Sequence, residues 1–164
     1  MELAVELPDV PVQVRAMLYE QRAPSVCRSI FESLVEPLET QTSHACFCGH
    51  QIFCFLPAFP TPPPVENITL RSSPGDLMFF YAAENAYAWM HEEGGRMAPE
   101  GPTAAVYELA FNYGAVDLSY FAAEGWQGSL VGRITAGLEA FADACAQTLE
   151  HGTTALRVSR IESP

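Results

Sequence analysis

Hydrophobic and polar residues alternate along several short stretches of this chain, which is the pattern of β strands with one buried face. After a loose start interrupted by Pro8 and Pro11, residues 12–19 alternate in this way and predict the first strand. A polar turn is expected over residues 39–43. Two apolar runs, 44–48 and 51–56, are hinged at Gly49 and predict either a hairpin or one strand with a bulge. Further strands are predicted over residues 77–81, 106–113, 129–134 and 156–159.

Helical spacing replaces the alternation in two segments. The first begins at Pro24, which the first turn of a helix tolerates, and ends before Pro37. The second is expected to be capped by Thr135 and stopped by Gly152. The apolar stripe of this second helix consists of Leu138, Phe141, Cys145 and Leu149.

Many strands, two helices and no strand–helix–strand rhythm predict a mainly β fold, a closed or nearly closed antiparallel barrel capped by helices. At 164 residues the chain is long enough for one domain with one core. Five prolines between residues 57 and 64 predict a surface loop, either a stiff connector or a recognition motif for a partner. Glycines and prolines over residues 92–102 predict a mobile excursion that could cover a pocket.

Charge limits the partners. Eight basic and twenty acidic residues give a formal net charge of −12, which repels phosphate groups, so neither nucleic acid nor an anionic membrane is expected. The chain has no run of about 18 apolar residues, and its acidic start differs from a signal peptide. We therefore expect a cytoplasmic protein with free thiols at its five cysteines. No cofactor is expected, because no Gly-rich phosphate loop is present.

Two segments resemble parts of cyclophilins. Residues Arg22–Leu34 look like the first cyclophilin helix, and Leu130–Glu139 look like the segment where a late strand runs into a helix. Over about residues 12–160, the chain is similar to an uncharacterised bacterial cyclophilin-like family, a domain of unknown function. The motifs that carry this similarity are His44-Ala45, Cys48-Gly49, Glu66-Asn67, Pro74-Gly75-Asp76, Tyr113-Gly114 and Gly137–Ala142. The resemblance implies a cyclophilin-like closed β-barrel capped by two α-helices, in a single domain spanning residues 1–164.

The resemblance does not extend to peptidyl-prolyl isomerase activity. Cyclophilin isomerases use an Arg, with a Gln nearby, to polarise the prolyl amide. The equivalent stretch here, Ser43 to Phe55, contains no Arg, and no Lys or Arg lies between Arg28 and Arg71. Without that donor the expected electrostatic stabilisation is missing, so isomerase activity is not expected.

His44 and Glu108 are the candidate catalytic residues. An imidazole can act as acid, base or hydrogen-bond donor near neutral pH, and the resemblance also singles out His44. The alternative is a structural histidine. Glu108 interrupts an apolar strand, so its carboxylate must either face solvent or occupy a pocket where burial raises its pKa.

Four residues are candidate ligand-binding groups. Glu66 and Asn67 stand where the Pro-rich loop ends, and they either offer a carboxylate and an amide to a ligand or merely cap a turn. Tyr81 and Tyr113 are expected to lie side by side through sheet pairing. Together with His44, these phenols would form a pocket for a small polar molecule.

Four alternate positions of one segment carry His or Cys, but a metal site is not predicted there. His and Cys are zinc ligands, but alternate strand positions stand about 6.5–7 Å apart, so four of them cannot close one tetrahedron. Buried cysteines that pack the barrel wall are the better interpretation. The four positions are His44, Cys46, Cys48 and His50.

Two functions from different classes remain open. In the first, the barrel binds or transforms a small polar molecule in a pocket near His44, and whether it is an enzyme stays undecided. In the second, it is a non-catalytic interaction module that uses the Pro-rich loop and the barrel surface. The first requires His44 and Glu108 to converge on one cavity with shifted pKa values. A homodimer is the expected assembly.

Overall fold

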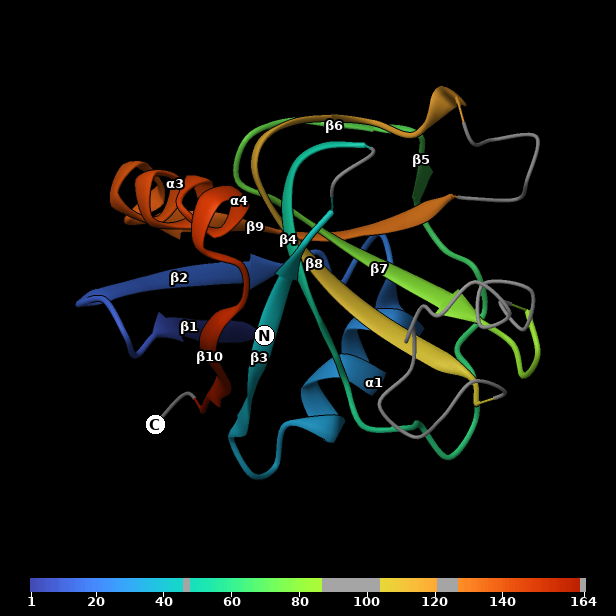
Figure 1. Ribbon diagram of the computed structural model, residues 1–164. Coiled ribbons are helices and arrows are strands. Elements are labelled where there is room, and N and C mark those ends of the chain that lie inside the picture. The colour runs from blue at the N-terminus through green and yellow to red at the C-terminus, as the bar shows by residue number, and fades with distance from the viewer. Residues whose placement is uncertain (46–47, 87–103, 121–126, 163–164) are drawn as a thin grey trace.

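The computed structural model describes residues 1–45, 48–86, 104–120 and 127–162, which contain ten strands and three helices (Figure 1). The excursion predicted over residues 92–102 lies outside these ranges. The helices are α1 (Pro24–Ser33), α3 (Leu138–Ala146) and α4 (Thr148–His151). The strands are β1 (Glu2–Leu7), β2 (Val12–Leu18), β3 (Leu38–His44), β4 (Gly49–Phe55), β5 (Ile68–Thr69), β6 (Arg71–Ser72), β7 (Asp76–Ala82), β8 (Val106–Asp117), β9 (Gly128–Ala136) and β10 (Thr154–Ile161).

Eight of the described strands close into an antiparallel barrel, which confirms the predicted fold class. Around the ring the order is β2, β1, β10, β3, β4, β8, β7 and β9, and β9 returns to pair with β2. The short strands β5 and β6 add to β9 and β8. Every strand of the ring therefore has a hydrogen-bonded neighbour on each side, which removes the exposed edges of an open sheet.

Side-chain alternation fills the barrel. On β2, Val14, Ala16 and Leu18 are buried while the residues between them are exposed, as the sequence pattern predicts. On β8, Leu109 and Phe111 are fully buried in the same core. The Pro-rich residues 57–67 contain neither helix nor strand, in agreement with the predicted loop.

The two longer helices cover opposite ends of the barrel, α1 at the bottom of Figure 1 and α3 at the upper left. α1 follows the end of β2 and buries Val26 and Ile30 in the core. α3 begins beside the start of β2, where Gly137 lies against Gln13 and Val14. No helix in the described ranges is both long enough and apolar enough to cross a membrane.

The predicted cap of the last helix is wrong. Thr135 belongs to β9, and its hydroxyl donates to the carbonyl of Arg15 on the neighbouring strand at 3.2 Å. The cap position is occupied by Gly137, whose φ of +83° is a left-handed conformation that glycine adopts without steric cost. The strand therefore turns into the helix through a single glycine. Leu149, the last member of the predicted stripe, falls in α4 and is 56% exposed.

The predictions for two further segments are also wrong, and both segments form strands that lie next to β10. The expected polar turn over residues 39–43 forms most of β3, and the expected loose start forms β1. β1 and β3 are the two neighbours of β10, which pairs with them from the far end of the chain. β3 is polar on most of its positions, including the buried Thr42, so its pairing with β10 is what distinguishes it from a turn. β1 buries Leu3, Val5 and Leu7 in ordinary alternation, which the prolines that follow it obscure in the sequence.

The outer surface of β1, β2, β10 and β3 is rich in charge, and we call it the charged wall. Arg157 lies between two carboxylates, 3.9 Å from Glu6 and 3.8 Å from Glu39. Arg15 lies 3.7 Å from Glu2. The side chains of these five residues are between 26% and 79% exposed, so water solvates this half of the barrel.

Candidate functional site

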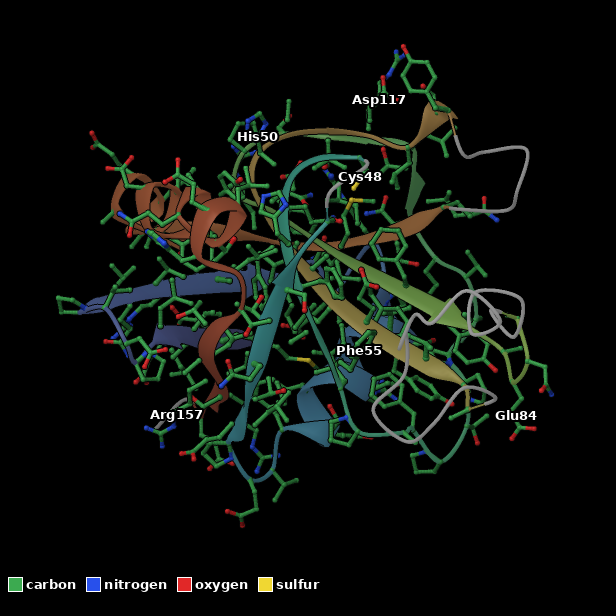
Figure 2. All side chains as sticks on the ribbon, in the orientation of Figure 1. Cys48, His50, Phe55, Glu84, Asp117 and Arg157 are labelled. Atoms are coloured by element: carbon green, nitrogen blue, oxygen red, sulfur yellow. The ribbon has the colours of Figure 1, made fainter. Side chains whose placement is uncertain are left out.

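The outer surface of β4, β8 and β7 is apolar, unlike the charged wall. The register places Phe55 of β4 and Phe80 of β7 on either side of Glu108 on β8 (Figure 2 labels Phe55). One row along, two more apolar side chains flank Ala110 in the same way. We call this surface the aromatic wall, and its members are Phe53, Phe55, Met78, Phe80, Glu108 and Ala110.

The aromatic wall exists because β8 is apolar on both of its faces. Tyr107, Leu109 and Phe111 point inward and belong to the main core. The residues between them therefore point outward, and Ala110 packs there with Met78 in a second apolar cluster, which the partly buried Phe53 and Phe80 join.

Glu108 is the ionisable member of the aromatic wall. It is only 8% exposed, and burial raises the pKa of its carboxyl from 4.5 to about 8. No described residue hydrogen-bonds to it or forms an ion pair with it. The sequence left open whether this side chain faces solvent or a pocket. It points out of the barrel and is nevertheless buried, so it stays a neutral acid near pH 7.

A row of hydrogen-bonded amides borders the aromatic wall. Gln51 is 2% exposed and donates from Nε2 to Oδ1 of Asn112 at 2.8 Å. Asn112 is fully buried and donates from Nδ2 to Oγ of Ser72 at 2.6 Å. Cys48 Sγ lies 3.4 Å from Oε1 of Gln51 and donates to it. These bonds tie β4, β8 and β6 together and keep the polar end of the wall rigid.

His44 lies elsewhere, at the end of the barrel that α3 covers. Its Nε2 lies 2.6 Å from the hydroxyl of Tyr113, and the two rings meet edge to face. Burial lowers the pKa of His44, with a smaller lowering from nearby His50 and a partial offset from a backbone hydrogen bond of Ala45. Burial, and to a smaller extent Cys145 of α3, raises the pKa of Tyr113. The hydrogen bond therefore joins two groups that are neutral near pH 7.

The structure does not bring His44 and Glu108 together. His44 pairs with Ile52 on β4, which in turn pairs with Phe111 on β8. Glu108 and Phe111 are three positions apart on one strand and so point to opposite faces. The shared cavity required for a joint His44–Glu108 active site is absent from the described part of the protein.

Tyr81 and Tyr113 are also separated, so their expected adjacency is wrong. Tyr81 pairs with Tyr107, six positions along β8 from Tyr113, which corresponds to about 20 Å of strand. At that end of the barrel the Tyr107 ring lies 5.2 Å from Tyr81 and 4.7 Å from Phe59 of the Pro-rich loop. Tyr81 therefore belongs to an aromatic cluster that anchors this loop.

Glu66 and Asn67 have structural partners. The carboxylate of Glu66 accepts from the backbone amides of Ser25 and Val26 at 2.9 and 3.1 Å, which caps the N-terminus of α1. Asn67 has a left-handed backbone with φ of +46° and donates from Nδ2 to the Leu130 carbonyl at 2.6 Å. Of the two interpretations the sequence left open, these contacts support capping.

Three of the four alternate His and Cys positions, His44, Cys48 and His50, lie in the described ranges, and they form no metal-binding group there. Gly49 breaks the alternation with φ of +126°, and a Cβ there would meet the Ala115 carbonyl oxygen at 2.4 Å. Cys46 lies outside the described ranges. Within those ranges, no group of three or more His, Cys, Asp or Glu side chains is placed to hold a metal ion. The fully or almost fully buried free thiols are Cys27, Cys54 and Cys145.

Two hollows formed by described residues lie away from all of these groups. One, of about 460 Å³, is lined by residues 18–22 between β2 and α1. The other, of about 780 Å³, lies on the charged wall around Glu39 and Arg157. Neither is lined by any residue predicted to bind or react, so they do not mark the predicted site.

Apart from Glu108, the residues of the aromatic wall are not predicted by the sequence analysis. Two signals were present: Phe53 and Phe55 alternate along β4, and Glu108 and Asn112 stand four positions apart in an apolar strand. The missing information was the register that joins β4, β8 and β7, because it alone shows that Phe80 and Phe55 flank the same carboxyl.

Comparison with known proteins places the chain among barrels of this kind. Residues 5–160 match the model of a family described as protein of unknown function (DUF3830). No curated protein matches the sequence. The solved structure of McbB in complex with tryptophan has a similar fold, with a TM-score of 0.63 at 17% sequence identity.

The similarity to McbB covers 99% of this chain and 45% of the McbB chain, so this chain spans less than half of that protein. At this level of identity the likeness shows the fold, a cyclophilin-like barrel, and does not by itself transfer an activity.

Proposed function

This chain belongs to the DUF3830 family of proteins of unknown function, and on that premise we propose that its aromatic wall binds a small organic molecule. The polar group of that molecule meets Glu108, and its apolar body packs on the phenylalanine rings. The observation that carries the proposal is the carboxyl of Glu108, 92% buried on an outer surface and without a partner among the described residues.

A buried carboxyl without a partner destabilises a fold. Replacing it with an apolar residue would cost the barrel nothing in hydrogen bonding, because no described group bonds to it. Groups of this kind concentrate at binding and catalytic sites, where desolvation adjusts their pKa for proton transfer or for hydrogen bonding in the neutral form. A pKa of about 8 allows Glu108 to donate or accept a proton near neutral pH.

The surroundings of Glu108 fit a ligand with an apolar body. Phe53 and Phe55 meet edge to face, with ring centroids 5.6 Å apart, and both are only partly buried. Phe80 faces them from the other side of the carboxyl and is likewise partly buried. Aromatic walls with one polar group are typical of small-molecule sites. McbB, a structural neighbour of which this chain matches 45%, was solved in complex with tryptophan, which is a small molecule with a flat apolar body.

We place this site at Glu108 and not at His44. The Nε2 atom of His44 is engaged by Tyr113 at 2.6 Å, and that pair lies between the barrel interior and α3. An interaction module is the competing function, because partly exposed aromatic rings also fit a protein partner.

The test is a binding screen observed at labelled methyl groups. Met78 and Ala110 are fully buried in the cluster that Phe53 and Phe80 join, so they report on the packing of the aromatic wall. Met17 and Ala155, whose side chains face outward on the charged wall, are the control positions. The panel contains small aromatic compounds that are cationic, neutral or anionic. We expect shifts at Met78 and Ala110 that weaken in Glu108→Gln and Phe55→Ala. Shifts confined to Met17 and Ala155, or no shift with any compound, would refute the proposal, and the second result would favour the interaction module.

A further inference from the structure

We propose that the molecule bound at the aromatic wall is an organic cation, an amine with a flat apolar body, whose ammonium group pairs with Glu108. This inference rests on the proposed binding function and adds the charge of the ligand. The carboxyl is buried between Phe55 and Phe80 with no cation beside it among the described residues, so a ligand can supply a positive charge.

Two arginines of the neighbouring strands pair with other carboxylates and not with Glu108. Arg71 is 3.0 Å from Asp117, beyond the amide row on β8. Arg133 is 3.4 Å from Asp76, at the start of β7. An anionic ligand would therefore find no described positive group at the wall to offset its charge, and its own charge would hold the Glu108 proton in place.

On the neighbouring strands, no charged group of the described residues faces Glu108. The residue opposite it on β4 is Phe55, and the residue opposite it on β7 is Phe80. Cys54 of β4 lies on the inner face, where burial, with a smaller contribution from Glu108, raises its pKa. A thiol with a raised pKa carries no charge at neutral pH, so of these two described groups it is Glu108 that responds to the charge of a ligand.

The rings also favour a cation. A positive charge over the face of an aromatic ring gains about 0.5–2 kcal/mol, and two phenylalanines, Phe55 and Phe80, flank this carboxyl. The formal net charge of −12 raises the concentration of small cations near the whole surface. Both effects disfavour an anionic ligand of the same shape.

Binding of an amine displaces a proton. In the free protein near pH 7, Glu108 holds its proton, because burial raises its pKa to about 8. When the ammonium group arrives, the carboxyl releases this proton to the buffer and becomes the carboxylate of the ion pair. The ligand keeps its own protons, so about one proton leaves for each molecule bound. The association constant is therefore expected to rise about tenfold per pH unit below pH 8 and to level off above it.

The experiment compares three probes of one shape by titration calorimetry: 2-phenylethylamine, 2-phenylethanol and 3-phenylpropionate. Each is titrated in two buffers with different ionisation enthalpies at the same pH. We expect the amine to bind at least tenfold more tightly than the alcohol, with about one proton released, and the carboxylate to bind most weakly. In Glu108→Gln the preference for the amine and the proton release are expected to disappear, whereas Glu39→Gln on the charged wall should keep both.

The outcomes separate the two proposals. If the alcohol or the carboxylate binds as tightly as the amine, or the amine binds without proton release, the cation proposal is wrong. Shifts at Met78 and Ala110 with those probes would still leave the small-molecule site standing. If none of the three probes shifts the methyl signals of Met78 or Ala110, the cation proposal is refuted. If no compound of the wider binding screen shifts them either, the small-molecule site is refuted as well. The comparison of probes uses the wild-type protein, so it does not depend on the folding of any variant.

Discussion

The charged wall and the aromatic wall are outer surfaces of one barrel, and their ionisable side chains differ in exposure and in pairing. On the charged wall, Arg157 has two carboxylate neighbours, Glu6 and Glu39, at distances near 4 Å, and all three side chains are well exposed. On the aromatic wall, Glu108 has no described partner and is 8% exposed. The strand pairing that closes the ring is the same in both halves.

This difference separates a solvated surface from a specialised one. Exposed ion pairs contribute little to folding, because water and salt screen them and long side chains lose entropy when they pair. A buried unpaired carboxyl, in contrast, opposes folding at every pH where it is ionised. A barrel needs no such group for its own stability, so the aromatic wall is the surface at which we propose binding.

The largest expected effect comes from removing the carboxyl. The unfolded chain loses the Glu108 proton near pH 4.5 and the folded protein near pH 8, so the folded state holds one more proton between these values. Stability of the wild type should therefore fall as pH rises from about 4.5 to 8, by up to about 5 kcal/mol. Glu108→Gln should remove this fall and be more stable than the wild type at pH 9, as measured by urea unfolding.

The control for that prediction is Glu39→Gln, which changes an exposed carboxylate of the charged wall. It should alter stability by less than about 1 kcal/mol at any pH. Parallel pH profiles for the wild type and Glu108→Gln would contradict the buried-acid description of the aromatic wall.

A smaller effect is expected from Phe80→Ala, which opens the aromatic wall beside Glu108. Full burial of a phenylalanine makes truncation cost about 3–5 kcal/mol, so this partly buried one should cost about 2–3 kcal/mol. It should also lower the pKa of Glu108 toward its usual value, because water gains access to the carboxyl. Met17→Ala on the charged wall, where the side chain is 43% exposed, should cost less than about 1 kcal/mol. Equal losses from the two substitutions would remove the distinction between the walls.

Hydrogen bonds should show the same contrast at lower magnitude. Asn112→Ala leaves the Nε2 donor of Gln51 and the hydroxyl of Ser72 without their buried partner, at a cost of about 2 kcal/mol. Gln13→Ala removes an exposed 3.3 Å bond to Glu6 on the charged wall and should change stability by less than about 0.5 kcal/mol. Denaturant titration of both variants measures the difference. An unchanged free energy of unfolding in Asn112→Ala would show that the amide row is not rigid.

The smallest effect is the coupling between side chains on each wall. A double-mutant cycle on Arg157 and Glu39 should give no more than about 0.5 kcal/mol, and 0.5 M NaCl should reduce it further. A cycle on Phe53 and Phe55 should give about 0.5–1.5 kcal/mol that salt leaves unchanged. A strong, salt-resistant coupling of Arg157 to Glu39 would contradict the solvated character of the charged wall.

Much of the fold could be predicted from the sequence, because alternation and helical spacing are local patterns. The periodicity of residues 12–18 marks β2, and Pro24 marks the start of α1, since each records which face of its own element is buried. The same local logic failed for β3, whose polar sequence resembles a turn until β10 pairs with it. It also overlooked β1, whose buried apolar residues come directly before Pro8 and Pro11.

The site depended more on tertiary structure than the fold did. Sequence alone showed that Glu108 was an anomaly, a carboxylate inside an apolar strand, and it showed the absence of an Arg where cyclophilin isomerases carry one. It could not show that His44 faces the interior and Glu108 the exterior, nor that Glu66 caps α1 from 40 residues away. A strand's own pattern specifies which residues share a face, whereas the register and closure of the barrel decide which neighbours each face meets, and those neighbours set the burial and the pKa of every candidate group.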